Sequence, residues 1–355
     1  MIQPFVYNAL PGRVIFGSGT IARVPDEVRL LGCSRALVLS GAHSKGRARE
    51  LAARLGGLCA GTFTEAVMHT PVEVTERAME AVRVARADCT VAVGGGSAIG
   101  LGKAIALRTD LPQIVIPTTY SGSEVSAMQG ETKDGQKTTQ RSLKILPEVV
   151  IYDVDLTLSL PPALSATSGM NAIAHAVEAL YAREGNPITS LMAEQGIAAL
   201  ARALPRILRD PNDKDARADA LYGAWACGTC LSVGMALHHK LAHVLGGSFG
   251  LPHSETHTVL LPHAAAYNQS AAAPAMARVA GALGVPSAPQ GLFDLAASLG
   301  APTSLRQLGM PEQGLDRAVE LVLAAPYWNP RELERTPLRA LLEDAYHGRR
   351  PRGPQ

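Results

Sequence analysis

Residues 88–107 read "DCTVAVGGGSAIGLGKAIAL", and this stretch decides the fold. A short β-branched run, "TVAV", leads directly into three glycines, and a helix-forming run begins directly after them. Glycine lets the backbone approach a ligand closely, and the start of a helix presents unpaired N–H groups to an anion. A tight strand-to-helix turn also needs glycine for purely conformational reasons, so a structural turn and a phosphate site both fit the pattern. We favour a site for the pyrophosphate of a nucleotide at Gly94, Gly95, Gly96 and Ser97.

Strands and helices alternate on both sides of this turn. The run "RALVLSG" at 35–41 precedes an amphipathic helical stretch, and apolar strands recur at 112–117 and 147–153. This alternation predicts a Rossmann-like parallel sheet with helices on both faces. Hydroxyl side chains in "PTTYSGSE" follow one of these strands and should reach the same carboxyl edge as the glycines. These predicted coenzyme contacts are Thr118, Thr119, Ser121 and Ser123.

The end of the predicted strand at 36–40 bears on the choice of coenzyme. A dinucleotide site that selects NAD over NADP usually places a carboxylate at such a strand end, where it holds the ribose hydroxyls and repels a 2′-phosphate. Here the strand ends in Ser40, which does neither strongly. We therefore expect Ser40 to lie against the coenzyme, and we expect both NADH and NADPH to serve.

The composition is that of a compact globular protein. The 355 residues are 47% hydrophobic and 18% charged, and they are enough for two domains. A net charge of +2 provides no electrostatic footprint for nucleic acid or for an anionic membrane. The N-terminal residues lack a signal-peptide pattern, and no apolar run is long enough to span a bilayer. We expect a cytoplasmic protein with no nucleic-acid or membrane partner.

Five scattered cysteines, an odd number, make a disulfide framework improbable. Cys227 and Cys230 form a CxxC in a small, apolar stretch. Because no second pair completes a zinc site, we favour two buried packing residues over a redox pair.

From about Leu160 onward the strand signals largely disappear, and helical periodicity replaces them. We divide the chain at this point into an α/β dinucleotide-binding domain, 1–160, and an all-α catalytic domain, 161–355. The site is expected in the cleft between them.

The helical half carries a dense group of histidines. Residues 237–257 read "LHHKLAHVLGGSFGLPHSETH" and hold five of them. Two are four apart on one helix, which we expect to end at the glycines 246–247, and a polar pair is four apart on an earlier helix. A further histidine falls in "GLPHSE", which we expect to be a loop. Each alone is typical of a core position, but together they favour a functional cluster. Its members are Asn171, His175, His239, His243 and His253.

Four stretches resemble the iron-containing (group III) alcohol dehydrogenases: "GGGSAIGLGKA", "PTTYSGSEVS", "GMNAIAHAVEALY" and "HHKLAHVLGGSFGLPHSETHTVLLPHAAAYN". The resemblance extends over about residues 10–350 and implies the dehydroquinate synthase-like fold of that family. It also implies that His175, His239 and His253 correspond to histidines that hold a metal in the family, together with an aspartate. His243 corresponds to a histidine that serves the active site without binding the metal.

The sequence departs from this family at the metal site. Asn171, a neutral amide, stands where the family has its aspartate, so the set lacks the anionic oxygen that divalent iron favours. Gly100 stands where metal-dependent members tend to carry aspartate, and "TTYSGSE" replaces a longer form. These departures resemble one branch of the family, the maleylacetate reductases, and we expect no catalytic metal.

Resemblance to this branch implies reduction of the C=C bond of maleylacetate, a dicarboxylate, to 3-oxoadipate in aromatic catabolism, with NADH or NADPH. A conjugated enone spreads the developing charge onto its oxygen, where N–H donors can hold it without a Lewis acid. We expect His243 to donate the proton and the other three histidines to anchor the substrate. Further predicted substrate contacts are Asn171, Tyr120, Lys240 and Arg331.

Two other functions stay open at this point. One is a metal-dependent alcohol dehydrogenase that uses the carbonyl oxygen of Asn171, and loss of activity in EDTA would identify it. The other is a nucleotide sensor without catalytic activity, which would not need the polar cluster. We also expect a homodimer.

Overall fold

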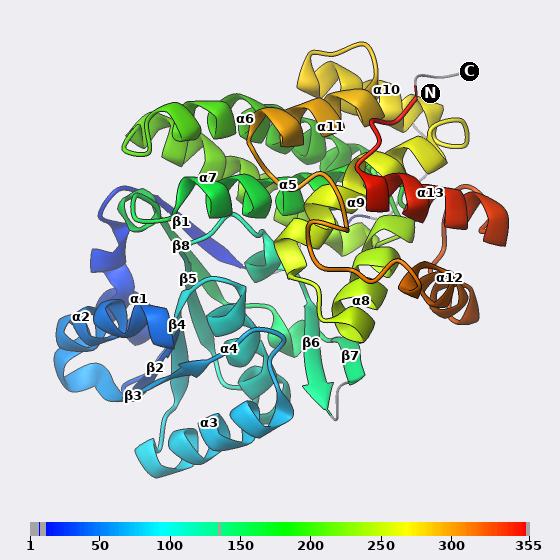
Figure 1. Ribbon diagram of the computed structural model, residues 1–355. Coiled ribbons are helices and arrows are strands. Elements are labelled where there is room, and N and C mark those ends of the chain that lie inside the picture. The colour runs from blue at the N-terminus through cyan, green and yellow to red at the C-terminus, as the bar shows by residue number, and fades with distance from the viewer. Residues whose placement is uncertain (1–6, 8–11, 134–135, 353–355) are drawn as a thin grey trace. The chain divides into compact units, whose positions relative to one another are not determined.

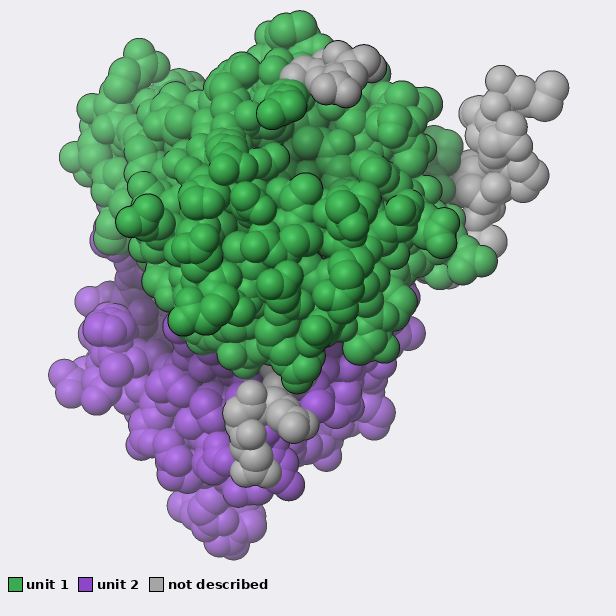
Figure 2. All heavy atoms as spheres, turned by 45° about the vertical axis from the view of Figure 1, so that its right-hand side comes forward, with its two compact units in different colours: residues 1–8, 161–355 green, residues 9–160 purple. Residues whose placement is uncertain are grey.

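The computed structural model describes residues 7, 12–133 and 136–352. The chain forms two compact units, which Figure 2 colours purple (9–160) and green (1–8 and 161–355). The first unit is built on a parallel sheet and the second on helices, which confirms the predicted fold class.

A six-stranded sheet forms the centre of the α/β unit (Figure 1). Every pair of neighbouring strands is parallel, as the alternation of strands and helices predicts. In spatial order the strands are β1 (Arg13–Gly17), β8 (Val149–Asp153), β5 (Gln113–Pro117), β4 (Cys89–Gly94), β2 (Ala36–Gly41) and β3 (Cys59–Ala66). A separate antiparallel ribbon joins β6 (Met128–Lys133) and β7 (Gln136–Arg141). The ribbon could not be predicted from the sequence, because "MQGETK" and "QKTTQR" contain no apolar run.

Alternate side chains of β2 explain how helices cover both faces of the sheet. Ala36 and Val38 join one buried cluster with residues of α1 and α2, whereas Leu37 and Leu39 join another with residues of α3 and α4. The helices of this unit are α1 (Val24–Leu30), α2 (Lys45–Leu55), α3 (Val72–Ala85) and α4 (Gly96–Thr109). With both faces buried, the strand ends are what the sheet offers to a ligand.

In residues 161–352 the structure shows helices and connecting segments, and no strand. The helices are α5 (Pro162–Ala179), α6 (Pro187–Arg209), α7 (Lys214–Thr229), α8 (Leu237–Phe249), α9 (His253–Asn268), α10 (Ala273–Leu283), α11 (Ala288–Ser298), α12 (Gly314–Ala324) and α13 (Arg335–His347). Helix α5 is central, because every residue from Ser165 to Ala179 is buried and α6, α7 and α9 pack against it. Small residues allow this close packing: a Cβ on Gly169 would lie 2.7 Å from Leu204 Cδ1.

Short 3₁₀ turns complete the described elements: η1 (Thr20–Arg23), η2 (Ala42–Ser44), η3 (Gly56–Leu58), η4 (Ser123–Val125), η5 (Leu143–Ile145), η6 (Val154–Thr157) and η7 (Cys230–Val233).

Two local predictions around the histidines are wrong. Helix α8 does not end at 246–247 but continues to Phe249, and Gly250 ends it with a φ of 67° in the left-handed region. The Phe249 ring packs on the core of the helical unit, so tertiary packing outweighs the low helix propensity of the two glycines. His253 is not in a loop either, because it is the first residue of α9 and directly follows Pro252.

The apolar segment around Cys227 and Cys230 is buried, and both cysteines are free, as expected of packing residues. The Cys230 thiol donates to the carbonyl oxygen of Thr189 at 3.3 Å, and burial raises the pKa of Cys230 to about 12. Among the described residues, no single helix combines the length and apolarity needed to cross a membrane, and one pair bent by 100°, Lys214–Val233 with Leu237–Phe249, passes that test jointly on length and composition alone.

Candidate active site

The glycine turn after β4 has the shape of an anion site. Gly94 has a φ of 151°, a backbone conformation that L side chains rarely adopt, and a Cβ on Gly95 would lie 2.9 Å from Cγ2 of Thr119. Gly96 is exposed, with open space around its Cα, and it begins α4 without a side-chain cap. Ser97 follows in the first turn of that helix, partly exposed. A backbone that is open at a helix N-terminus can receive a phosphate.

The topology places this turn where open α/β sheets bind ligands. Strands β2 and β4 are neighbours, but the chain continues from β2 to β3 on one side and from β4 to β5 on the other. This reversal is a topological switch point, and the carboxyl ends of β2 and β4 flank its crevice. The segment after β5 reaches the same edge, since the Thr118 N–H donates to the Gly94 carbonyl oxygen at 3.0 Å.

Ser40 does not occupy the position predicted for it. Strand β2 continues to Gly41, and the Ser40 side chain is fully buried, with its hydroxyl donating to the Gly41 carbonyl oxygen at 3.3 Å. The hydroxyl therefore contacts the backbone at the end of its own strand. The sequence predicted that β2 ends at Ser40, one residue too early. Because side chains alternate between the two faces of a strand, an error of one residue places a side chain on the wrong face.

A buried lysine, which our reading of the sequence missed, holds the loop after β5. Lys103 Nζ donates to the carbonyl oxygens of Ser123 and Ser126, both at 2.6 Å, and to that of Met128 at 3.2 Å. Burial lowers the pKa of Lys103 to about 7, and the nearby Glu124 carboxyl opposes this shift. The sequence feature that could have identified Lys103 is the single charge within the apolar run "GLGKAIAL".

Two other residues of this unit are constrained by close packing. Tyr120 is fully buried. A Cβ on Gly100 would lie 2.6 Å from Oγ1 of Thr70, a residue that itself has a φ of 46°. A side chain at position 100 would therefore require Thr70 or the helix to shift. Ser123 Oγ lies 3.2 Å from Ser121 Oγ.

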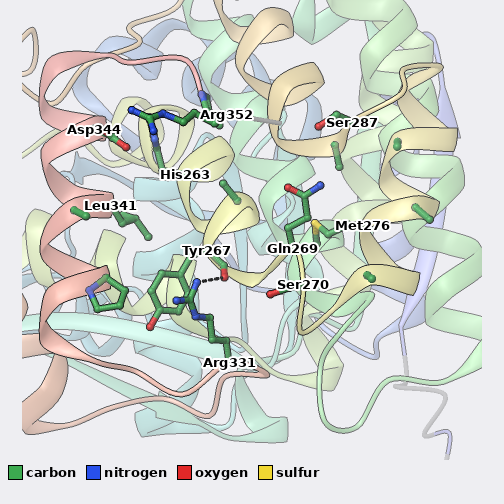
Figure 3. A pocket seen from close by; sticks show the side chains of 18 of the residues that line it. His263, Tyr267, Gln269, Ser270, Met276, Ser287, Arg331, Leu341, Asp344 and Arg352 are labelled. Atoms are coloured by element: carbon green, nitrogen blue, oxygen red, sulfur yellow. Dashed lines mark hydrogen bonds between the residues drawn. The ribbon is translucent and has the colours of Figure 1, made fainter. Parts of the chain in front are cut away.

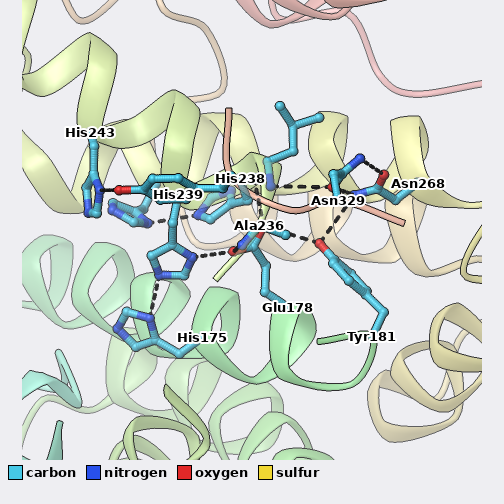
Figure 4. Close-up of polar contacts among 12 residues, drawn as sticks. His175, Glu178, Tyr181, Ala236, His238, His239, His243, Asn268 and Asn329 are labelled. Carbon is cyan, nitrogen blue, oxygen red and sulfur yellow. Dashed lines mark hydrogen bonds and ion pairs between the residues drawn. The ribbon is translucent and has the colours of Figure 1, made fainter. Parts of the chain in front are cut away.

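In the helical unit, α5 and α8 bring three polar side chains into one line (Figure 4). His175 Nδ1 lies 2.8 Å from His239 Nε2, and His239 Nδ1 lies 2.6 Å from Oε2 of Glu178. All three residues are buried. Glu178 was missed, although it is three residues after His175 and therefore on the same face of α5.

The Glu178 carboxylate also receives the start of α8. The backbone N–H groups of Ala236 and His238 donate to its two oxygens, each at 2.7 Å, and the Tyr181 hydroxyl lies 3.4 Å from Oε1. Helix α8 has no side-chain cap of its own, so Glu178 satisfies N–H groups that the first turn leaves unpaired. The positive end of the helix dipole favours a carboxylate at this point.

A second pair of imidazoles lies beside the first. His238 Nε2 is 2.8 Å from His257 Nδ1, and burial lowers the pKa of both residues well below the usual value. Both are therefore neutral at physiological pH. His253 joins the group through its ring, whose centroid is 4.4 Å from that of His257. Neither His238 nor His257 was predicted as a site residue. His257 is four residues after His253, but the expectation that His253 lies in a loop concealed this i, i+4 pair on α9.

The remaining cluster residues differ in their partners. His243 Nδ1 lies 3.2 Å from the Tyr327 hydroxyl, and Lys240 Nζ lies 5.3 Å from the centre of the same ring. Asn171 is buried, and its Oδ1 has no hydrogen-bond partner in the part of the chain that the structure describes. Among the described residues, His238 Nδ1 and His257 Nε2 are likewise buried without a hydrogen-bond partner.

Arg331 is not placed with the histidine cluster. Its guanidinium lies over the ring of Tyr267, with 4.3 Å from Cζ to the ring centre, and donates to the Tyr267 carbonyl oxygen at 3.1 Å. It lines a pocket of about 770 Å³ together with His263, Asp344 and Arg352 (Figure 3). The described lining of this pocket includes no member of the predicted cluster. Arg331 lies in an irregular segment, so the sequence has no helical or strand periodicity from which its position could be predicted.

Comparison with known proteins agrees with this arrangement. Residues 11–154 match the iron-containing alcohol dehydrogenase family, and residues 165–346 match the C-terminal part of the Fe-containing alcohol dehydrogenase family. The chain is 59% identical to a maleylacetate reductase of Rhizobium sp. (strain MTP-10005), covering 99% of this chain and 100% of that one. It is 54% identical to a maleylacetate reductase of Sphingobium indicum, covering 98% and 99%. A crystal structure of maleylacetate reductase from Agrobacterium tumefaciens, 59% identical, superposes with a TM-score of 0.95 over 99% of this chain and 100% of that one. The chain is an oxidoreductase of the iron-containing alcohol dehydrogenase family.

Proposed function

We propose that this protein reduces the C=C bond of maleylacetate to give 3-oxoadipate, with NADH or NADPH as the reductant. The observation that carries the proposal is identity of 59% to a maleylacetate reductase over essentially the whole of both chains. The glycine turn at the switch point supports a dinucleotide, since Gly95 has no room for a side chain and Gly96 leaves the helix N-terminus open.

The chemistry suits a buried group of imidazoles. A bound reduced nicotinamide supplies a hydride to the carbon β to the ketone. The electron pair of the C=C bond then becomes an enolate, and an acid must place a proton on the carbon α to the ketone. Imidazole N–H groups can hold the enolate oxygen, and an imidazolium can provide the proton. His175, His239 and His243 lie on facing helices that present such groups together.

The substrate carboxylates need positive charge or N–H donors. Lys240 is a cation close to His243, since both residues contact Tyr327. We assign one substrate carboxylate to Lys240 and the other to the region of His253, and we keep Asn171 and Tyr120 as substrate contacts. Arg331 is not assigned to the substrate, because it is held over Tyr267.

We further propose that the reaction needs no metal. Both nitrogens of His239 are engaged, one by His175 and one by Glu178, so neither is left as a ligand in this arrangement. The oxygen at position 171 belongs to a neutral amide, which is a weaker ligand than carboxylate for divalent iron. Among the described His, Cys, Asp and Glu side chains, ligand atoms gather closely enough for three-fold coordination at Cys33, Asp88 and Cys89, outside this cluster.

The test is coenzyme oxidation by the purified protein with freshly made maleylacetate, run beside simple aldehydes and ketones. We expect rapid oxidation with maleylacetate and little with the others, and we expect NADH and NADPH to agree within about tenfold in kcat/KM. Turnover of aldehydes with none of maleylacetate would favour the alcohol dehydrogenase alternative. We also propose that the protein is a homodimer in the cytoplasm. Light scattering of the purified protein measures its mass in solution and tests the dimer.

A further inference from the structure

We propose that Cys33, Asp88 and Cys89 of the α/β unit form a site for a thiophilic divalent cation such as Zn²⁺. One ligand atom of each residue, a sulfur from each cysteine and a carboxylate oxygen from Asp88, lies within 4.8 Å of the other two. Zinc in proteins is bound by these two kinds of ligand, and three protein ligands leave a fourth position for water. The site would hold an ion apart from the proposed reduction, whatever the substrate.

The sheet brings these three residues together from separate parts of the chain. Cys89 is the first residue of β4, and its partner in the parallel register is Ala36, the first residue of β2. The segment that leads into β2, which contains Cys33, therefore lies beside the start of β4, and the Asp88 N–H donates to the Arg35 carbonyl oxygen at 3.0 Å. The group is thus at the amino ends of the strands, whereas the glycine turn follows the carboxyl end of β4.

The backbone that leads into β2 holds the Asp88 carboxylate in place. Its Oδ2 accepts the Ser34 N–H at 2.8 Å and the Ser34 hydroxyl at 3.1 Å, and its Oδ1 accepts the Arg35 N–H at 2.8 Å. A carboxylate offers about four acceptor positions, so these contacts leave room for an ion. Hydrogen bonds of this kind orient a ligating carboxylate, as the outer contacts of metal sites in proteins do.

The two thiols would exchange weak contacts for bonds to the ion. Both cysteines are free and buried, and Cys33 Sγ lies 3.6 Å from the carbonyl oxygens of Leu31 and Asp88. Burial raises the pKa of both thiols, and the Asp88 carboxylate adds to this shift, so both are neutral without an ion. On binding, the two S–H bonds break, the protons pass to solvent, and two bonds form between sulfur and the ion.

The charges around the group favour a cation. The carboxylates of Asp88 and Glu148 both raise the pKa of Cys33, so both make the position of its sulfur electronegative. The Arg35 guanidinium is directed to the end of α3, where it donates to the carbonyl oxygens of Ala85 and Arg86. Asp88 is partly exposed whereas both cysteines are buried, so an ion would reach the sulfurs past the carboxylate.

Titration of the native protein with Co²⁺ tests the site directly. The protein is first reduced and dialysed exhaustively against EDTA, which can remove an ion through the coordination position that three protein ligands leave open. We expect one Co²⁺ per chain to bind with a thiolate-to-cobalt charge-transfer band, and Zn²⁺ to displace it. Because the ion replaces two thiol protons, we expect the affinity to rise with pH, by up to about 100-fold per unit. A native protein that binds no Co²⁺ through sulfur would overturn the proposal.

Single alanine variants then identify the ligands. We expect Cys33→Ala and Cys89→Ala each to lower the Zn²⁺ affinity by at least about 100-fold, beyond the loss of about 10–100-fold that is typical of an outer contact. Cys59→Ala and Cys230→Ala are matched controls, because Cys59 is a partly exposed and Cys230 a buried free cysteine outside the group. Both controls should bind like the native protein. A charge-transfer band that persists in Cys33→Ala and disappears in Cys230→Ala would place the ion at other cysteines and contradict the proposal.

Two further measurements on the native protein decide the matter even where a cysteine variant does not fold. Weakly buffered titration should release two protons for each Zn²⁺ bound, and release of none would exclude the thiols as ligands. The thermal midpoint should rise with Zn²⁺, because the ion binds the folded state, and kcat should stay unchanged, because the group is at the edge of the sheet opposite the glycine turn. Stabilisation by Zn²⁺ that is lost in His175→Ala and kept in Cys33→Ala would assign the ion to the histidine cluster and overturn the proposal.

Discussion

At the scale of single residues, burial decides the behaviour of polar groups more than residue type does. Lys103 and Glu178 are both buried, and both bind backbone groups that would otherwise be unsatisfied. Each therefore ties two segments together: Lys103 joins α4 to the loop after β5, and Glu178 joins α5 to the start of α8. A charge held in this way is costly to remove, because its partners stay buried without a bond.

Lys103 should make stability depend on pH in a defined window. Burial lowers its pKa to about 7 from an ordinary value of 10.5. Between these values the unfolded chain binds a proton that the folded chain has released, so the free energy of unfolding rises with pH. The difference between the native protein and Lys103→Met should therefore grow above pH 7, by up to about 1.4 kcal/mol per pH unit, and stay flat below it. Denaturant unfolding at several pH values measures this, and a difference that is constant over the whole range would contradict it.

The structure changes the effect that we expect from the substitution Ser40→Asp. From the sequence alone, Ser40→Asp should shift coenzyme preference towards NADH by repelling a 2′-phosphate. The side chain is fully buried, however, so a carboxylate there would lose its hydration without gaining a partner. We expect Ser40→Asp to lower the thermal midpoint and leave the ratio of kcat/KM for the two coenzymes within about threefold of the native value. A ratio shifted tenfold or more in a stable variant would show that Ser40 does reach the coenzyme.

At the scale of elements, the turn between β4 and α4 determines what the sheet edge can bind. A Cβ on Gly95 would contact Thr119, whereas a Cβ on Gly96 would meet nothing within 4 Å. Gly95 therefore allows close packing within the turn, and Gly96 leaves the backbone accessible. The periodicity of the flanking runs predicted this strand, this turn and this helix correctly, because the strand is buried on both faces and is apolar apart from Thr90. The ends of β2 and α8 were predicted less well, since the last residue of the strand and the last two residues of the helix depend on packing against distant side chains.

Gly95→Ala should disturb the coenzyme site in particular. The added Cβ would lie 2.9 Å from Cγ2 of Thr119, so either the turn or the threonine must move. We expect KM for the coenzyme to rise about tenfold or more, with a smaller change in KM for maleylacetate. Gly46→Ala on α2, where a Cβ meets nothing within 4 Å, is the control and should behave like the native enzyme. Equal coenzyme KM values in the two variants would separate the turn from coenzyme binding.

At the scale of the whole molecule, sequence and structure support the same function by different routes. The positions of Asn171 and the histidines indicated the family, and the contacts of His239 with His175 and Glu178 support the proposal of a reaction without metal. The sequence could not reveal that Glu178 occupies one nitrogen of His239, because this contact joins residues 61 positions apart. The sequence also could not predict that the Arg331 guanidinium lies over the Tyr267 ring. Arg331 is in an irregular segment, which has no periodicity from which to infer where a side chain points.

The measurement that tests the central claim most directly is maleylacetate-dependent NADH oxidation before and after exhaustive dialysis against EDTA, with metal content determined on the same samples. Because both nitrogens of His239 are engaged by protein groups, we predict full activity after dialysis and iron and zinc well below one ion per chain. Activity that is lost on dialysis and restored by a divalent ion would contradict the account, since a metal would then have to displace the contacts of His239 with His175 and Glu178.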